Sequence, residues 1–227
     1  MLKLIHMKIT WYGHSCFKFM VKTNNGDKIT IITDPFDKTK VGLTPPRVTA
    51  DLVLVSHNHD DHNNVKAING DPFVVEGPGE YDIKGVFVRG VYSYHDLSKG
   101  EERGISTIYV IEAEGMKICH LGDFGEKELS GQQLDKIGHI DILIIPVGGV
   151  YTINGTEAVK IINQVEPKIV IPMHYQTSKF PKLKNKLNSV NKFLEEIGEK
   201  GELLEELSIQ SKDLIEDKMR IVVMKLT

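Results

Sequence analysis

Cysteine is scarce in this chain of 227 residues, which contains only Cys16 and Cys119. Two cysteines cannot form the disulfide framework of a small secreted domain. Both lie in apolar runs, where a free cysteine behaves as a small hydrophobic residue. We therefore expect two free thiols and a reducing, cytoplasmic environment.

Long hydrophobic runs and a strong charge of one sign are also missing. No apolar stretch reaches the roughly 18 residues that a membrane span requires. The first residues, 1–7, have neither a sustained apolar core nor a small-residue cleavage site, so we expect no signal peptide. The net charge is only −3, which excludes a strong overall attraction to nucleic acid or to a membrane.

The composition is that of an ordinary globular protein, with 41% hydrophobic and 26% charged residues. No linker, low-complexity segment or short repeat divides the chain, and we expect a single domain over residues 1–227. Runs rich in β-branched and aromatic residues recur between turn residues and predict strands. These runs are residues 8–12, 15–21, 28–33, 51–56, 73–76, 86–94, 106–113, 116–121, 140–146, 168–172 and 220–225.

Helices are fewer. The clearest prediction is a helix over 181–197, where Leu183, Leu187, Val190, Leu194 and Ile197 form an apolar stripe that Gly198 ends. A second helix is predicted over 157–165, capped by Thr156, and weaker ones over 126–137 and 63–69. The mixture predicts an α/β (α+β) fold rich in antiparallel sheet.

Histidines and aspartates follow several of the predicted strands, at the point where each strand ends. Strand ends tend to share one edge of a sheet, and rigid strand ends hold ligands in fixed positions, as a metal site needs. Residues 51–56 lead into His57-Asn58-His59-Asp60-Asp61-His62. The earlier run 28–33 ends in Asp34, and later runs end in His95, His120 with Asp123, and His174.

Imidazole nitrogens and carboxylate oxygens suit zinc, iron or manganese. In an extended segment His57 and His59 point the same way, and a tight turn brings Asp61 and His62 to a neighbouring point. One segment can then serve two metals. A structural zinc site of the cysteine type is not expected, because only Cys119 lies near these residues.

The segment His57-x-His59-x-Asp61-His62 resembles the HxHxDH motif of the metallo-β-lactamase superfamily. The later residues are similar in order: His95, then Gly122-Asp123, then His174. The resemblance covers residues 11 to about 175, and the segments 11–17 and 145–152 resemble its ascorbate-6-phosphate-lactonase-like branch. It implies an αββα four-layer sandwich of two similar halves, with the site at one edge.

The resemblance also implies a ligand set. His57, His59 and His95 would hold a first metal; Asp61, His62 and His174 would hold a second; Asp123 and a hydroxide would bridge them. Asp61 would also orient the hydroxide. The metals would be two divalent ions, zinc or else manganese or iron. The sequence departs from the lactamases after His95, where residues 96–100 lack the usual Gly-Thr context, so that loop and its substrate contacts are expected to differ.

Four further residues have two interpretations each. Asp34 is either the carboxylate partner of an imidazole ligand or an ordinary turn residue. His14 either contacts substrate or caps a turn. His120 either supports the site or is a buried, hydrogen-bonded core residue. Tyr175 is either a phenolic donor or packing, and Gly148-Gly149 either allow close approach of the backbone to substrate or form a plain loop.

The sequence predicts a metal-dependent hydrolase that acts on a small anionic ester, lactone or phosphodiester. A first alternative is a nuclease of the same fold that reads RNA or DNA through a lysine-rich helix. A second is a non-catalytic metal-binding protein. A homo-oligomer is compatible with the sequence. The lysines in question are Lys179, Lys182, Lys184, Lys186 and Lys192.

Overall fold

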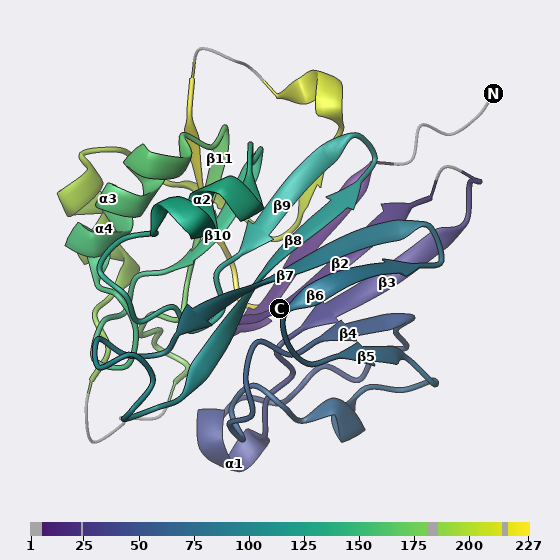
Figure 1. Cartoon of the computed structure of the whole chain (residues 1–227), viewed down its shortest axis with the longest axis horizontal. Coiled ribbons are helices and arrows are strands. Elements are labelled where there is room, and N and C mark those ends of the chain that lie inside the picture. Colours follow the sequence, from purple (N-terminus) through teal and green to yellow (C-terminus); the bar gives the residue numbers. More distant parts are fainter. Residues whose placement is uncertain (1–5, 24, 181–185, 215–217) are drawn as a thin grey trace.

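Two β-sheets form the centre of the computed structural model, which describes residues 6–23, 25–180, 186–214 and 218–227 (Figure 1). The first sheet has six strands in the order β13-β1-β2-β3-β4-β5. Its strands are β1 (Met7–Gly13), β2 (Cys16–Lys22), β3 (Lys28–Thr33), β4 (Leu52–Leu54), β5 (Phe73–Val75) and β13 (Leu207–Ile209).

The second sheet has eight strands in the order β12-β14-β11-β10-β9-β8-β7-β6. Its strands are β6 (Gly79–Ile83), β7 (Val86–Tyr94), β8 (Ile105–Ala113), β9 (Met116–His120), β10 (Ile142–Pro146), β11 (Ile169–Met173), β12 (Glu202–Leu204) and β14 (Arg220–Met224). The predicted strands are confirmed, whereas the sequence analysis missed β6, β12 and β13. β6 alternates between buried and exposed residues, and β12 and β13 are three residues long, so none shows an apolar run.

The main core lies between the two sheets. Trp11, Phe17 and Phe19 of the first sheet are buried in one hydrophobic cluster with Tyr109 and Ile144 of the second. β10 is buried along its whole length, as is typical of a strand with other β-strands on either side and covered faces. The apolar surface of each sheet is thus removed from water by the other.

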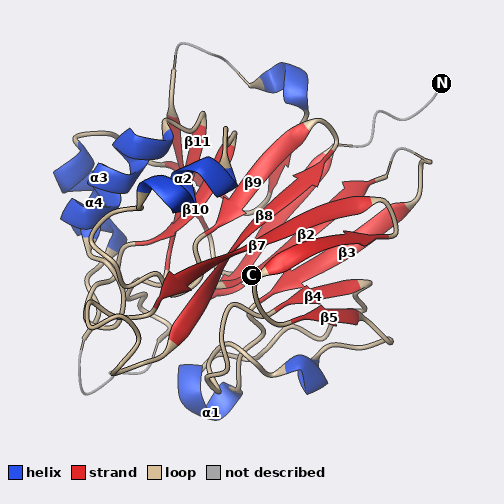
Figure 2. Ribbon diagram, viewed as in Figure 1, coloured by secondary structure: helices blue, strands red, loops and turns tan. Residues whose placement is uncertain are grey.

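Helices cover the outer faces (Figure 2). On the second sheet these are α2 (Gly131–Ile137), α3 (Gly155–Val165) and α4 (Val190–Ile197). The outer face of the first sheet is covered by α1 (Lys38–Val41), the 3-10 turn Val65–Ala67 and loops, around a smaller core with Phe36 and Phe180. The predicted α/β fold of four layers is confirmed, with one thin outer layer.

The caps explain where α2 and α3 begin. Asn154, not the predicted Thr156, caps α3: its side chain accepts from the Glu157 amide and the Glu157 carboxylate accepts from the Asn154 amide. Ser130 and Gln133 form the same reciprocal pair at α2. The predicted helix over 126–137 therefore begins only at Gly131, and that over 63–69 shrinks to the 3-10 turn.

The predicted helix over 181–197 is confirmed over 190–197 and wrong over 186–189. Residues 181–185 lie outside the described residues, and the helix begins at Val190. The backbone of Asn188 is instead paired with two other segments, because its N–H donates to Gly148 and its C=O accepts from Gln176. Leu187 is buried there, so its place in the apolar stripe reflects tertiary packing and not helical periodicity.

The strand ends that carry the candidate ligands share one edge, as predicted. β1 and β3 are both antiparallel to β2, and β4 is parallel to β3, so the turns after β1, β3 and β4 lie together. In the second sheet β9, β10 and β11 are parallel and β7 runs in their direction, since both β7 and β9 are antiparallel to β8. Ligands commonly bind at the carboxyl ends of such strands.

Both cysteines are free and buried, as predicted. Among the described residues, the helices are too short or too polar to cross a bilayer.

Candidate metal centre

Three histidines form what we name the first cluster: His57, His59 and His95. One ring nitrogen of each lies within 4.8 Å of those of the others. His57 and His59 lie in the loop after β4, and His95 directly follows β7. The rings of His57 and His59 are 4.5 Å apart and those of His57 and His95 are 4.7 Å apart, centroid to centroid. The structure therefore brings together the three residues assigned from the sequence to one metal.

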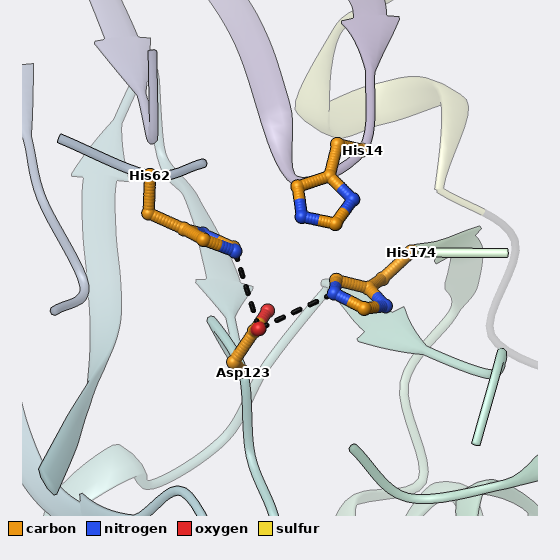
Figure 3. Close-up of side chains that lie close together, drawn as sticks. All are labelled: His14, His62, Asp123 and His174. Atoms are coloured by element: carbon orange, nitrogen blue, oxygen red, sulfur yellow. Dashed lines mark ion pairs between the residues drawn. The ribbon is translucent and has the colours of Figure 1, made fainter. Parts of the chain in front are cut away.

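Four buried residues form the second cluster: His14, His62, Asp123 and His174. Figure 3 shows their side chains converging from different segments on a common point. The Asp123 Oδ2 atom lies 3.1 Å from His62 Nε2 and 3.2 Å from His174 Nε2. Three of these residues were expected here, whereas His14 was not predicted as part of a ligand set.

Asp123 lies between the two clusters. Besides His62 and His174, its Oδ2 atom approaches His95 Nε2 of the first cluster at 3.3 Å. The Ser15 hydroxyl donates to the other oxygen, Oδ1, at 3.3 Å. The Asp123 carboxylate thus contacts imidazoles of both clusters.

Asp61 lies at the edge of the second cluster. Its Oδ2 atom is 3.3 Å from His14 Nε2 and 3.9 Å from His62 Nε2, and its side chain is 38% exposed. It is not in the group whose donor atoms all lie within 4.8 Å of one another. The structure thus places Asp61 beside the second cluster and on the solvent side.

The turns that carry His14 and His174 are fixed against each other. Both residues have positive φ angles, 55° for His14 and 52° for His174. Such a conformation costs of order 1 kcal/mol for a residue other than glycine and persists only where its surroundings enforce it. Here the His174 N–H donates to the His14 carbonyl at 3.2 Å, and Trp11 Nε1 donates to the same oxygen at 3.0 Å.

Two glycines let the site loops approach each other. A Cβ atom on Gly148 would overlap the carbonyl oxygen of His174, and one on Gly125 would overlap the backbone of His95. The close approach expected at Gly148 is therefore made to the His174 backbone, so this glycine acts within the protein.

Asp34 is the partner of an imidazole, the first of its two interpretations. Its Oδ2 atom lies 3.1 Å from His62 Nδ1 and accepts from the Ser56 hydroxyl, and Oδ1 accepts from the Ser56 N–H. Ser56 Oγ lies 2.9 Å from His57 Nδ1. A carboxylate that fixes one ring nitrogen leaves the other ring nitrogen aimed into the site.

His120 and Tyr175 lie outside the ligand groups. His120 is fully buried, its Nε2 lies 2.9 Å from the Ser15 carbonyl, and its Nδ1 accepts from the Gly122 N–H. It therefore joins the turn after β1 to the turn after β9. Tyr175 packs on Trp11 with ring centroids 5.1 Å apart and does not line the cavity at the site. Tyr175 thus lies in the hydrophobic core.

The imidazoles differ in charge because their neighbours differ. Burial, followed by the charge of His62, lowers the pKa of His57 to about 2. Burial, followed by the charge of His174, lowers the pKa of His14 to about 4. Both rings are neutral at pH 7, the state that a metal ligand requires.

His62 and the carboxylates behave in the opposite way. Burial lowers the pKa of His62, but the negative charges of Asp123 and Asp34 outweigh it and raise that pKa well above its usual value. Burial raises the pKa of Asp123, but His174 and His62 outweigh it and hold that pKa well below its usual value. In the metal-free protein, protonated His62 thus supplies the positive charge that these carboxylates need.

Divalent metals fit this arrangement. Among the described residues, the buried histidine nitrogens without a hydrogen-bond partner all belong to the two clusters, and they include His14 Nε2, His57 Nε2 and His62 Nε2. In His95 and His174 the unpaired atom is Nδ1, while Nε2 is the atom that approaches Asp123. Buried polar atoms are rarely left unpaired without a functional reason. Imidazole and carboxylate together are the donor set of zinc, iron and manganese sites.

A cavity of about 370 Å³ opens beside the second cluster. Its wall combines site residues with a cation and apolar side chains: His14, Lys40, Val41, His59, Asp60, Asp61, Tyr151, His174, Phe180 and Leu187. Arg103, from the loop after His95, contacts one wall residue: its guanidinium lies 4.7 Å from the Tyr151 ring centroid.

The β-lactamase superfamily domain matches residues 8–174, which is more than half of the chain. The chain belongs to this superfamily. The predicted resemblance is thereby confirmed, and the matched range contains both clusters.

Several relatives are named as enzymes. A UPF0173 metal-dependent hydrolase of Thermoplasma acidophilum is 30% identical over 198 residues, 76% of this chain and 84% of the relative. One from Thermococcus onnurineus is 31% identical over 202 residues, 75% of this chain and 85% of the relative. A solved structure from Thermotoga maritima, named as a candidate zinc-dependent hydrolase of the metallo-β-lactamase superfamily, is 38% identical with a TM-score of 0.78, and the match covers 96% of this chain and 98% of that chain. The protein is a metal-dependent hydrolase of this superfamily.

Sequence reasoning missed the residues that act through tertiary contacts. Ser15 and Ser56 carry no motif, and only their contacts to Asp123 and Asp34 reveal them. Leu187 was predicted only as part of a helical stripe and Phe180 carried no prediction, although both line the cavity. A signal did exist for His14: it follows Gly13 at the end of a predicted strand, as the other site residues follow theirs.

Proposed function

We propose that the protein is a two-metal hydrolase that uses a hydroxide to cleave a small anionic ester, lactone or phosphodiester. The observation that carries the proposal is the position of Asp123, whose one oxygen lies within 3.3 Å of imidazoles from both clusters. A single metal would not require a carboxylate between two separate groups of histidines.

The first cluster would hold one divalent metal and the second cluster the other, with Asp123 shared. Zinc is favoured by the nitrogen-rich donor set, and manganese or iron are the alternatives. The metals would supply Lewis acidity and hydroxide at neutral pH. Two divalent cations exceed the charge of the nearby carboxylates and the hydroxide, which favours an anionic group on the substrate.

Asp61 is the side chain of the site best placed to act on the reacting water. Burial raises the pKa of Asp61, but the close approach of His14 and the charge of His62 outweigh burial and hold that pKa well below the usual value, so Asp61 is ionised at neutral pH. Because it lines the cavity, its Oδ2 atom can accept a hydrogen bond from the attacking water and orient it. The ligand role in the second site, assigned from the motif, is part of the same proposal.

A small substrate is supported by the size and wall of the cavity. A volume of about 370 Å³ lies at the lower end of the roughly 300–1,000 Å³ of small-molecule sites. Lys40 lies on this wall, where its ammonium pairs with Asp60 at 2.8 Å. Val41, Phe180 and Leu187 offer apolar surface to the rest of the molecule.

The nuclease alternative depends on a lysine-rich helix that the structure describes only in part. The described helix α4 begins at Val190 and, of these lysines, contains only Lys192. Lys186 lies before that helix, and Lys182 and Lys184 lie outside the described residues.

The test begins with metal content. Purified protein reconstituted with zinc or manganese is expected to hold two metals per chain by elemental analysis. It should hydrolyse at least one member of a panel of lactones, phosphodiesters and phosphorylated sugars. His139→Ala is the matched control, since this exposed imidazole lies outside both clusters. No more than one metal would contradict the dinuclear site, and two metals without turnover would favour a non-catalytic metal-binding protein.

A second experiment addresses the nuclease. Replacing Lys182, Lys184 and Lys186 together by Gln should leave hydrolysis of the small substrate nearly unchanged. A large loss of nucleic-acid cleavage, with a binding constant that falls steeply as salt rises, would instead make the nuclease the leading function.

A further inference from the structure

His14 takes part in the second cluster in a way that the motif does not assign. The HxHxDH segment and the later ligands account for His62, Asp123 and His174, but His14 lies in the turn between β1 and β2, far from them in sequence. A ring nitrogen of His14 nevertheless lies within 4.8 Å of the donor atoms of all three.

We infer that His14 is a ligand of the second metal, an inference that rests on the proposed two-metal function. Donor atoms bound at about 2.1 Å to one ion lie about 3.0–3.5 Å apart at the usual angles. His14 Nε2 and Asp61 Oδ2 are 3.3 Å apart, and His62 Nε2 and Asp123 Oδ2 are 3.1 Å apart. These spacings are those of neighbouring ligands on one ion.

The direction of the His14 ring favours a ligand over a hydrogen-bond donor to Asp61. The two groups are close enough for an ion pair, yet Nε2 is buried and makes no hydrogen bond. An N–H that served to orient Asp61 would point at the carboxylate. The Nε2 atom makes no hydrogen bond, and neither does the Nε2 atom of His62, although that atom lies 3.1 Å from Asp123 Oδ2.

The backbone fixes the imidazole in this place. His14 is 7% exposed, its φ is strained, and its carbonyl is held by both His174 and Trp11. The His14 ring centroid lies 4.0 Å from that of His174 and 4.7 Å from that of His62. In Figure 3 the ring stands with these two and Asp123 around one point. A surface histidine that merely capped the turn would need neither this burial nor the strained backbone and its hydrogen bonds.

His14→Asn is the informative variant, because asparagine tolerates a positive φ but lacks the imidazole. Metal-free protein is titrated with zinc against a chromogenic chelator, and with cobalt while the visible spectrum is recorded. In the variant we expect the second zinc to bind at least about tenfold more weakly, while the first binds as in the parent. The absorption of the second cobalt should change, since one nitrogen ligand is lost. His139→Asn removes an exposed imidazole and should change neither.

The variant Asp61→Asn distinguishes two roles of His14: a metal ligand, or a residue that only orients Asp61. If His14 is a ligand, adding His14→Asn to Asp61→Asn should weaken the second zinc by a further factor of about ten. If the double variant binds zinc as Asp61→Asn does, His14 acts only through Asp61 and the inference is wrong.

Two measurements distinguish a misfolded variant, a wrong role for His14 and a wrong proposed function. Thermal unfolding of the metal-free proteins shows whether His14→Asn folds; if it does not, His14→Asp tests the same point, because its carboxylate should restore part of the affinity that an amide cannot. Parental affinity for both zinc ions in His14→Asn would overturn the role of His14 alone. Fewer than two metals in the parent would overturn the proposed function, and the second metal with it.

Discussion

The first cluster takes His57 and His59 from one short loop, whereas each residue of the second cluster comes from a different turn. His14 follows β1, His62 closes the loop after β4, Asp123 follows β9 and His174 follows β11. Only His95 has to be brought to the first cluster from a distance. The second cluster therefore depends on how both sheets pack, and the first mainly on the path of one loop.

Burial separates the clusters in the same way. His59 is only half-buried, while all four residues of the second cluster are buried. The second cluster also has the stronger support: Asp34 pairs with His62, whereas His57 Nδ1 contacts only the neutral hydroxyl of Ser56. Charged partners bind more strongly than neutral ones in a buried site. The comparison indicates a locally encoded cluster beside one that the tertiary structure builds.

The double variant His57→Ala/His59→Ala should have the largest effect, because it removes two of the three histidines of the first cluster. We expect metal content to fall from two per chain to about one. Hydrolysis should fall by at least about a thousandfold, the upper range for loss of one transition-state donor. Elemental analysis measures the metal content, and initial rates measure hydrolysis. Retention of two metals would show that the clusters are not separate sites.

Asp61→Asn should have the next largest effect and should reach only the second cluster. It keeps the shape of the side chain but removes a negative charge at the cavity. Hydrolysis should fall by at least about a hundredfold, the scale of a catalytic proton-transfer group. The fold and the first metal should persist, and the second metal should bind more weakly. A variant that turns over substrate as fast as the parent would remove Asp61 from the mechanism.

The variant Asp34→Asn tests the hydrogen-bond partners that hold the imidazoles of the two clusters. Loss of a carboxylate behind an imidazole ligand typically costs about 10- to 100-fold in metal affinity. We expect that loss for the second metal, through His62, and a smaller one for the first, through Ser56 and His57. Ser56→Ala should show the reverse preference with a smaller effect. Chelator competition measures the metal affinity of both variants. Equal losses of affinity at the two sites would contradict the view that Asp34 mainly supports His62 and Ser56 mainly supports His57.

Gly125→Ala and Gly148→Ala perturb the clusters through the backbone and should have the smallest effects on binding. The added Cβ collides with His95 in the first case and with His174 in the second. Overpacking of this kind typically costs about 1–3 kcal/mol of stability. Thermal unfolding should show that loss in both variants, with weaker first-metal binding in Gly125→Ala and weaker second-metal binding in Gly148→Ala. Gly131→Ala, where a Cβ meets open space, is the control.

Local sequence patterns predicted much of the fold. Residues 28–33 and 86–94 became strands with the predicted bounds, because their apolar and β-branched residues match a strand with a buried face. The predicted helix over 181–197 was wrong over 186–189, because an apolar pattern reports burial and not helical structure itself. Leu187 is buried by the cavity wall and by pairing of its neighbour Asn188, which periodicity alone cannot distinguish from a helical stripe.

The sequence by itself determined the chemistry of the site: the HxHxDH segment and the strand ends before His95, Asp123 and His174 supplied the ligand types and their order. Only the tertiary structure decided that His14 joins the second cluster, that Asp34 supports His62, and that Tyr175 belongs to the core. The physical reason is that a motif is a local pattern, whereas these contacts join turns from separate strands. Their geometry depends on the register and packing of both sheets, which the sequence specifies only through all of its residues together.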